Sequence, residues 1–92
     1  MKDMKSKTVE LKVPKWFKGQ VYDEGDTVTN PFSGESYELT GLELSMYDFI
    51  MGAQLVMELS PRTIPEKQIN EFHKALNWFR RANSDAYYVL LD

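Results

Sequence analysis

The chain has 92 residues, of which 42% are hydrophobic and 27% are charged, and it contains no cysteine. This length is sufficient for one hydrophobic core, and it predicts a single domain spanning residues 1–92. Disulfides and thiolate metal sites are excluded. No apolar run approaches the ~20 residues that span a bilayer, and the polar N-terminus does not resemble a signal peptide. We therefore expect a cytoplasmic protein that does not associate with membranes.

Charge is segregated along the sequence, although the net charge is only −3. Residues 1–18 carry six lysines and two acids, whereas residues 19–61 carry eight acids and neither lysine nor arginine. We expect these two segments to attract each other within the fold. Residues 1–7 are expected to form a flexible basic arm.

The first half of the sequence predicts an antiparallel β-meander of three or four short strands. Residues 8–13 alternate between apolar and polar side chains, as a half-buried strand does. Residues 20–23 and 27–29 flank an acidic, glycine-containing turn, which predicts a hairpin. A second turn at residues 30–34 contains Pro31 and Gly34 and leads into a returning strand at residues 35–39. The fold class is therefore α+β, with the meander packed on the helices that follow.

Two amphipathic helices and a short C-terminal element are predicted next. Thr40 and Glu43 match a capping box, so the first helix is expected to begin there and to extend to residue 59. Pro61 and Pro65 interrupt the chain, and the second helix should run from residue 66 to about Asn83. Residues 86–91 are too apolar to be exposed, but six residues do not separate a helix from a strand by periodicity. We favour a short packed helix.

The first helix carries apolar side chains on two sides. Its predicted core face comprises Leu42, Met46, Phe49, Ile50, Ala53, Val56 and Met57, and a second stripe comprises Leu44, Tyr47, Met51 and Leu55. Small domains rarely expose such a row without a covering partner, so the stripe predicts a protein-interaction surface. The occupant would be another protein, or a second copy of the chain in a homo-oligomer. The alternative is that the second helix covers one apolar side and the meander covers the other, so that the first helix lies between them. Gly52, which costs ~1 kcal/mol relative to alanine in a helix, indicates close packing or a bend.

The second helix supports an alternative function in nucleic-acid binding. Its core stripe is Ile69, Phe72, Leu76 and Phe79. Its outer side carries Lys67, Lys74 and Arg81 at seven-residue spacing, beside Trp78. The basic N-terminal segment, which contains Trp16, is a further candidate for contacts with phosphates and bases. The acidic middle of the chain and a sequence pI of about 5.1 count against this function. A solvated helical face is the simpler interpretation of these cations.

Catalytic and metal-binding patterns are weak in this sequence. His73 is the single histidine, and we interpret it as a residue at the boundary of the second helix's apolar face. The acids at residues 23–26 lack the spacing of an EF-hand, and the glycines form no phosphate-binding loop. We therefore expect a non-enzymatic protein with no metal, no cofactor and no small-molecule substrate.

Five segments together carry a resemblance to a group of viral proteins: residues 13–22 (VPKWFKGQVY), 30–35 (NPFSGE), 47–52 (YDFIMG), 78–81 (WFRR) and 86–92 (AYYVLLD). In these segments the chain resembles small proteins encoded by tailed phages that infect marine bacteria, cyanophages among them. The resemblance implies expression in the cytoplasm of an infected bacterium and binding to host or viral machinery. It assigns no activity, so no functional residue is carried over from it.

Overall fold

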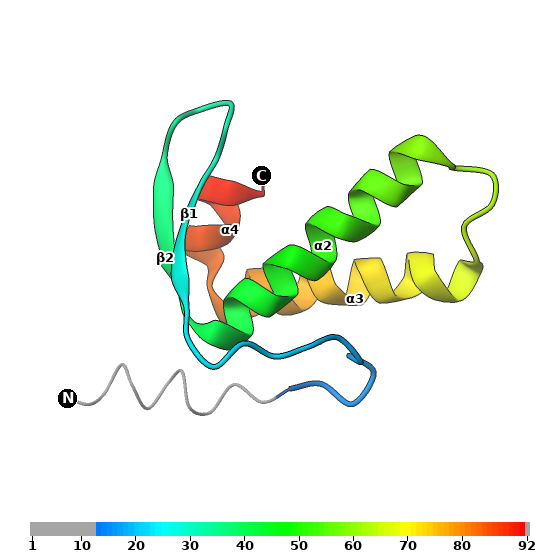
Figure 1. Ribbon diagram of the computed structural model, residues 1–92, viewed down its shortest axis with the longest axis horizontal. Helices are drawn as coiled ribbons and strands as arrows, with labels where there is room; N and C mark the ends of the chain where they lie inside the picture. The colour runs from blue at the N-terminus through cyan, green and yellow to red at the C-terminus, as the bar shows by residue number, and fades with distance from the viewer. Residues whose placement is uncertain (1–12, 92) are drawn as a thin grey trace.

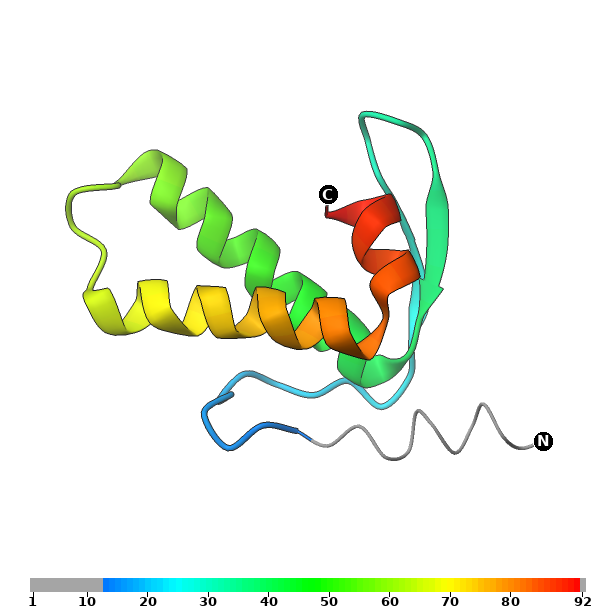
Figure 2. The same cartoon turned by 180° about the vertical axis from the view of Figure 1, so that it is seen from behind.

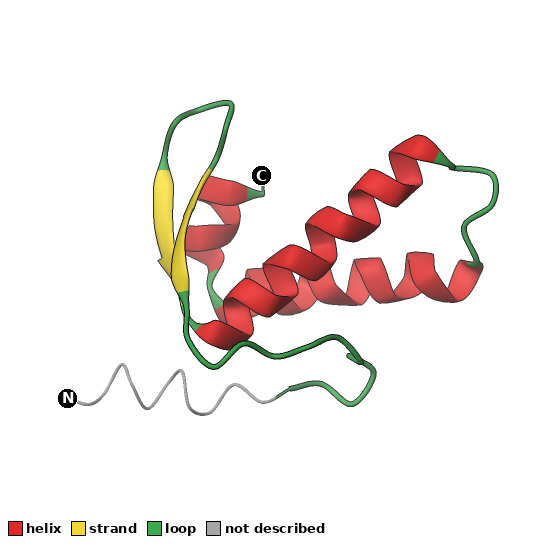
Figure 3. Ribbon diagram, viewed as in Figure 1, coloured by secondary structure: helices red, strands yellow, loops and turns green. Residues whose placement is uncertain are grey.

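The computed structural model describes residues 13–91, which form a two-stranded hairpin followed by three helices (Figure 1). The α+β class is thereby confirmed, and Figure 3 shows the separation of strands and helices along the chain. The elements are β1 (Asp26–Thr29), β2 (Ser36–Leu39), α2 (Gly41–Leu59), α3 (Glu66–Ala82) and α4 (Ser84–Leu90). The C-terminal element is a helix, as favoured above.

The hairpin is antiparallel, with Asp26 of β1 opposite Leu39 of β2. Its turn is organised by Asn30, whose backbone oxygen accepts a hydrogen bond of 2.8 Å from the Gly34 amide. Gly34 adopts a φ of 81°, a conformation that favours glycine. The Asn30 side-chain amide also donates to the carbonyl oxygen of Val89 at 3.0 Å, which ties the turn to α4. The turn and the returning strand are therefore confirmed.

The predicted strand at residues 20–23 is wrong, and β1 and β2 form the only sheet in residues 13–91. This segment lies against the N-terminal half of α2, where the Tyr22 amide donates to Ser45 Oγ at 2.8 Å. The Ser45 hydroxyl donates in turn to the carbonyl oxygen of Gly41. The backbone of this segment is therefore bonded to a helix instead of a neighbouring strand. The predicted strand at residues 8–13 lies outside the described residues, except for Val13, which is in a loop. The predicted arm at residues 1–7 also lies outside them.

The three helices meet in one polar network around Glu43. The predicted capping box is present: the Glu43 amide donates to Thr40 Oγ1, and the Thr40 amide donates to Glu43 Oε1 at 3.0 Å. The other carboxylate oxygen, Oε2, accepts from Asn83 Nδ2 at 3.2 Å. Asn83 Oδ1 accepts from the Ala86 amide and so caps α4. One buried carboxylate therefore joins the start of α2 to the junction between α3 and α4.

The core lies where α2, α3, α4 and β2 pack together, at the hairpin end of the molecule. From there α2 and α3 diverge toward the connection at residues 60–65, as seen from opposite sides in Figure 1 and Figure 2. Val56 is consequently 43% exposed, which corrects its assignment to the core face of α2. The buried core residues are Phe17, Leu39, Met46, Ile50, Ala75, Phe79, Ala86 and Leu90. Within residues 13–91, no helix has the length and apolar character needed to cross a membrane.

Candidate functional site

The structure divides the second apolar stripe of α2 into two halves. Leu44 and Tyr47 are partly buried and pack against the core. Met51 and Leu55 are 40% and 55% exposed. The four residues therefore do not form one continuous surface, and the exposed part is confined to the C-terminal half of the helix.

The N-terminal half of α2 is covered by the loop that contains Tyr22. The Tyr22 hydroxyl donates a hydrogen bond of 2.6 Å to Asp48 Oδ2. This bond and the negative charge of Asp48 raise the pKa of Tyr22 above its ordinary value. Burial, followed by the charge of Asp48, also raises the pKa of Tyr47. Both tyrosines are therefore protonated at neutral pH, and Tyr22 holds the loop on the helix as a hydrogen-bond donor.

C-terminal to Asp48, the apolar side chains on the outer side of α2 are exposed to solvent. Leu59 is 74% exposed, and Val56 is exposed beside it. At 100° per residue these side chains share one side of the helix, opposite the buried Met46, Ile50 and Ala53. We refer to this region as the α2 outer surface, which comprises Met51, Gly52, Leu55, Val56 and Leu59. The sequence prediction missed Leu59, although it continues the four-residue spacing of Met51 and Leu55.

Gly52 lies within the α2 outer surface and has open space above it. A Cβ atom built at this position has no neighbouring heavy atom within 4 Å. The close packing predicted for Gly52 is therefore not made by the described part of the chain. The helix nevertheless accepts glycine at a position where alanine would be more stable by ~1 kcal/mol.

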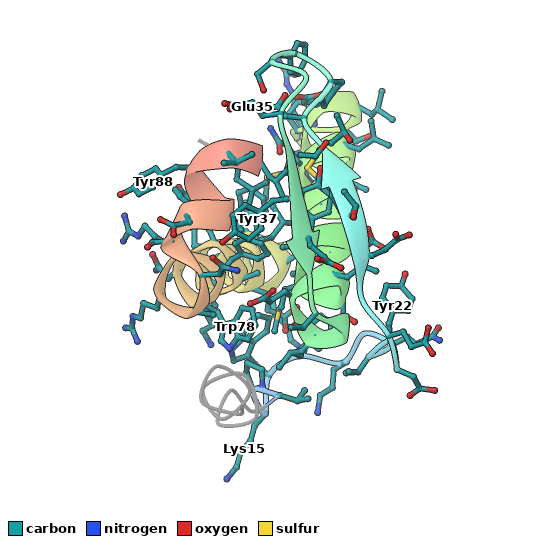
Figure 4. All side chains as sticks on the ribbon, turned by 90° about the vertical axis from the view of Figure 1, so that its left-hand side faces the viewer. Lys15, Tyr22, Glu35, Tyr37, Trp78 and Tyr88 are labelled. Carbon is teal, nitrogen blue, oxygen red and sulfur yellow. The ribbon has the colours of Figure 1, made fainter. Side chains whose placement is uncertain are left out.

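A second candidate surface lies between residues 14–18 and the outer side of α3. It consists of two adjoining open pockets, of about 680 and 270 Å³, which share Trp16 and Lys74. We refer to both together as the basic groove. Its lining residues are Pro14, Lys15, Trp16, Lys18, Glu66, Lys67, Asn70, Glu71, Lys74, Asn77, Trp78 and Arg81. All four residues of the predicted nucleic-acid set, Lys67, Lys74, Trp78 and Arg81, are therefore in it, together with Trp16. In Figure 4, Lys15 and Trp78 lie on the same side of the molecule.

Aromatic packing holds the N-terminal wall of the basic groove in place. Phe17 is buried, and its ring meets that of Phe49 edge-on at a centroid distance of 5.6 Å. Trp16 packs edge-on against Phe17 at 5.9 Å and also contacts Phe49 at 6.1 Å. Phe49 belongs to α2, so α2 fixes the position of the segment that faces α3.

The remaining sequence candidates are separate from both surfaces. His73 is exposed on α3, and its ring lies 5.7 Å from that of Phe72. Asp23, Glu24 and Asp26 are exposed in and after the loop that precedes β1. Among residues 13–91, no group of three or more histidine, aspartate or glutamate side chains is placed to hold a metal ion.

Comparison of the chain with protein-family models, with curated proteins and with solved structures finds no significant match. The α2 outer surface and the basic groove are therefore interpreted from their own geometry and chemistry.

Proposed function

We propose that the protein is a non-enzymatic interaction protein that pairs with a second copy of itself through the α2 outer surface. The observation that carries this proposal is the exposure of Met51, Leu55, Val56 and Leu59 within three helical turns around Gly52. A contiguous apolar patch on a small domain is typical of a surface that is covered by a partner. A glycine with open space above it also lets a second helix approach closely.

The surface is complementary to itself in an antiparallel arrangement. With a two-fold axis between residues 53 and 54, Leu55 of each copy lies over Gly52 of the other. Met51 then lies at the level of Val56 of the other copy, and Leu59 lies at the level of Asp48, just beyond the patch. Such reciprocal contacts are characteristic of a closed dimer with two-fold symmetry. A leucine side chain fills the space that a glycine leaves.

The charges at the ends of the surface also favour the antiparallel arrangement. Asp48 lies at the N-terminal end, and Arg62, the first base after Lys18, follows the C-terminal end. The last turn of α2 has no basic residue, and it contains Glu58, which adds to the negative end of the helix dipole. Antiparallel pairing brings each Arg62 toward Asp48 of the other copy. Parallel pairing would instead align like charges.

Replacing Met51 and Leu55 together with aspartate is expected to weaken pairing by about 100-fold or more, because pairing would then bury unpartnered carboxylates. Both side chains are exposed, so the monomer should remain folded. Sedimentation velocity over a range of concentrations measures the association, and circular dichroism measures the fold.

The matched control is Val21→Asp, which charges a side chain that is similarly exposed (40%) but lies outside the surface. It should pair as the unmodified chain does. Unfolding of the double variant would show that these residues belong to the core, and unchanged pairing would show that the surface is not used. A strictly monomeric unmodified chain would contradict self-pairing and leave a host or viral protein as the candidate occupant.

Gly52→Ala is expected to change stability and association in opposite directions. The methyl group meets no atom of the described chain, so the isolated monomer should gain up to ~1 kcal/mol from helix propensity. The same methyl group occupies the space assigned to Leu55 of the second copy, so the dissociation constant should rise. Urea unfolding at low concentration measures the first effect, and sedimentation measures the second. A variant that is more stable and pairs equally well would exclude Gly52 from the contact.

A further inference from the structure

The basic groove has the charge of an anion-binding surface. Five cations line it, Lys15, Lys18, Lys67, Lys74 and Arg81, against the carboxylates of Glu66 and Glu71. Glu71 lies one helical turn from both Lys67 and Lys74, so it neutralises part of their charge. An excess of positive charge remains on both walls, and Lys74 is common to both pockets.

The cations are spaced along a line. Lys67, Lys74 and Arg81 are separated by seven residues each, which corresponds to about 10 Å per step along an α-helix. The groove consists of two open pockets along α3, and Trp16 and Lys74 line both of them. This geometry fits a linear polyanion better than a compact anion, which would need a closed pocket with converging donors.

The aromatic side chains of the groove favour nucleic acid over other linear polyanions. The chain has two tryptophans, and both Trp16 and Trp78 line the groove while packing against the core. Cations that follow a phosphate backbone, combined with aromatic rings on which bases stack, are the usual elements of single-stranded nucleic-acid binding. An acidic peptide would use the cations but would not need the rings.

We infer that the basic groove binds single-stranded nucleic acid, with phosphates on the cations and bases on the rings of Trp16 and Trp78. Figure 4 shows Glu35, which follows the hairpin turn, and Lys15 at opposite ends of the molecule. The exposed Glu35 therefore adds negative charge at the end of the molecule away from Lys15, where it repels phosphates. This inference does not depend on pairing through α2.

Intrinsic tryptophan fluorescence reports directly on this groove, because both tryptophans line it. An oligothymidylate of about 15 nucleotides, within the usual range of single-strand site sizes, is expected to quench the fluorescence of the full chain. Lys74→Glu should weaken binding by at least about tenfold. The slope of log affinity against log salt should also become shallower, by about 0.7 for each phosphate that the variant no longer neutralises.

The matched control is Arg80→Glu, which makes the same change in net charge on the same helix. Arg80 is not a lining residue of the groove: its guanidinium lies over the Tyr87 ring of α4 at 6.0 Å and donates to Asn77 Oδ1 at 3.5 Å. It should retain affinity within about twofold at physiological salt, because its charged group lies toward α4 and salt screens that charge from the groove. Trp78→Phe should weaken binding without changing the salt slope, because it removes stacking area but no cation.

The inference is overturned if no quenching occurs at low salt, or if Arg80→Glu and Lys74→Glu weaken binding equally. It is also overturned if poly-glutamate competes as well as the oligonucleotide, since the groove would then be a site for acidic peptides. Circular dichroism of each variant separates loss of binding from loss of fold. Binding retained in the Met51→Asp, Leu55→Asp double variant would show that the groove acts independently of the α2 outer surface.

Discussion

Replacing Phe79 with alanine is expected to lower the free energy of unfolding by about 3–5 kcal/mol, a large effect for a domain of this size. Phe79 is fully buried and packs where α2, α3 and α4 meet, beside Met46 and Ile50. Truncation removes the apolar area of the ring and leaves a cavity that three helices would have to collapse to fill. Small domains are stable by only about 5–15 kcal/mol, so much of the total stability would disappear.

The matched control for Phe79 is Phe32→Ala, which makes the same chemical change at a side chain that is 96% exposed. It should alter stability by no more than about 0.5 kcal/mol. Urea unfolding followed by circular dichroism measures both variants. A decrease below about 1 kcal/mol for Phe79→Ala would contradict the central position of this ring in the core.

Glu43→Ala is expected to lower the free energy of unfolding by about 2–4 kcal/mol, because the Glu43 side chain makes hydrogen bonds at two helix ends. The substitution removes the acceptor for the Thr40 amide at the start of α2. It also leaves the side-chain amide of Asn83 without its carboxylate partner. Loss of a cap costs about 0.5–2 kcal/mol. A donor left unsatisfied in a buried site costs about 1–3 kcal/mol more. The same urea unfolding measures this destabilisation.

Glu43→Gln separates these two contributions. The glutamine side-chain oxygen can still accept from the Thr40 amide. Its NH2 group would face the NH2 group of Asn83, so two donors would meet. Asn83 is not free to flip, because its Oδ1 caps α4. The stability should therefore lie between those of the alanine variant and the unmodified chain. Glu58→Ala, at the exposed C-terminal end of the same helix, should be neutral or slightly stabilising. A glutamine variant as stable as the unmodified chain would show that the contact with Asn83 contributes nothing.

Local signals in the sequence predicted much of the fold. The capping box at Thr40 and Glu43, the turn at residues 30–34 and the two long helices all depend on residues that are close together in the chain. The strand predicted at residues 20–23 depended instead on its environment. An extended segment becomes a strand only beside another strand, and this one bonds to Ser45 and Asp48 of α2.

The candidate surfaces were predictable only in part, for the same reason. Periodicity identified the stripe through Leu44 and Leu55, but the packing of Leu44 and Tyr47 against the core could not be read from it. The bond of Tyr22 to Asp48 likewise joins residues 26 positions apart. The cations of α3 and the segment around Trp16 were each identified separately. Their position on facing walls of one groove depends on the packing of Trp16 and Phe17 against Phe49. Sequence patterns do not encode that packing in a readable form.

The most direct test of the proposed function is the solution mass of the unmodified protein, measured by light scattering across concentrations. Self-pairing through the α2 outer surface predicts a mass that rises with concentration from one chain of 10.7 kDa to a closed dimer, and no further. A mass that stays at one chain over the whole range would contradict it.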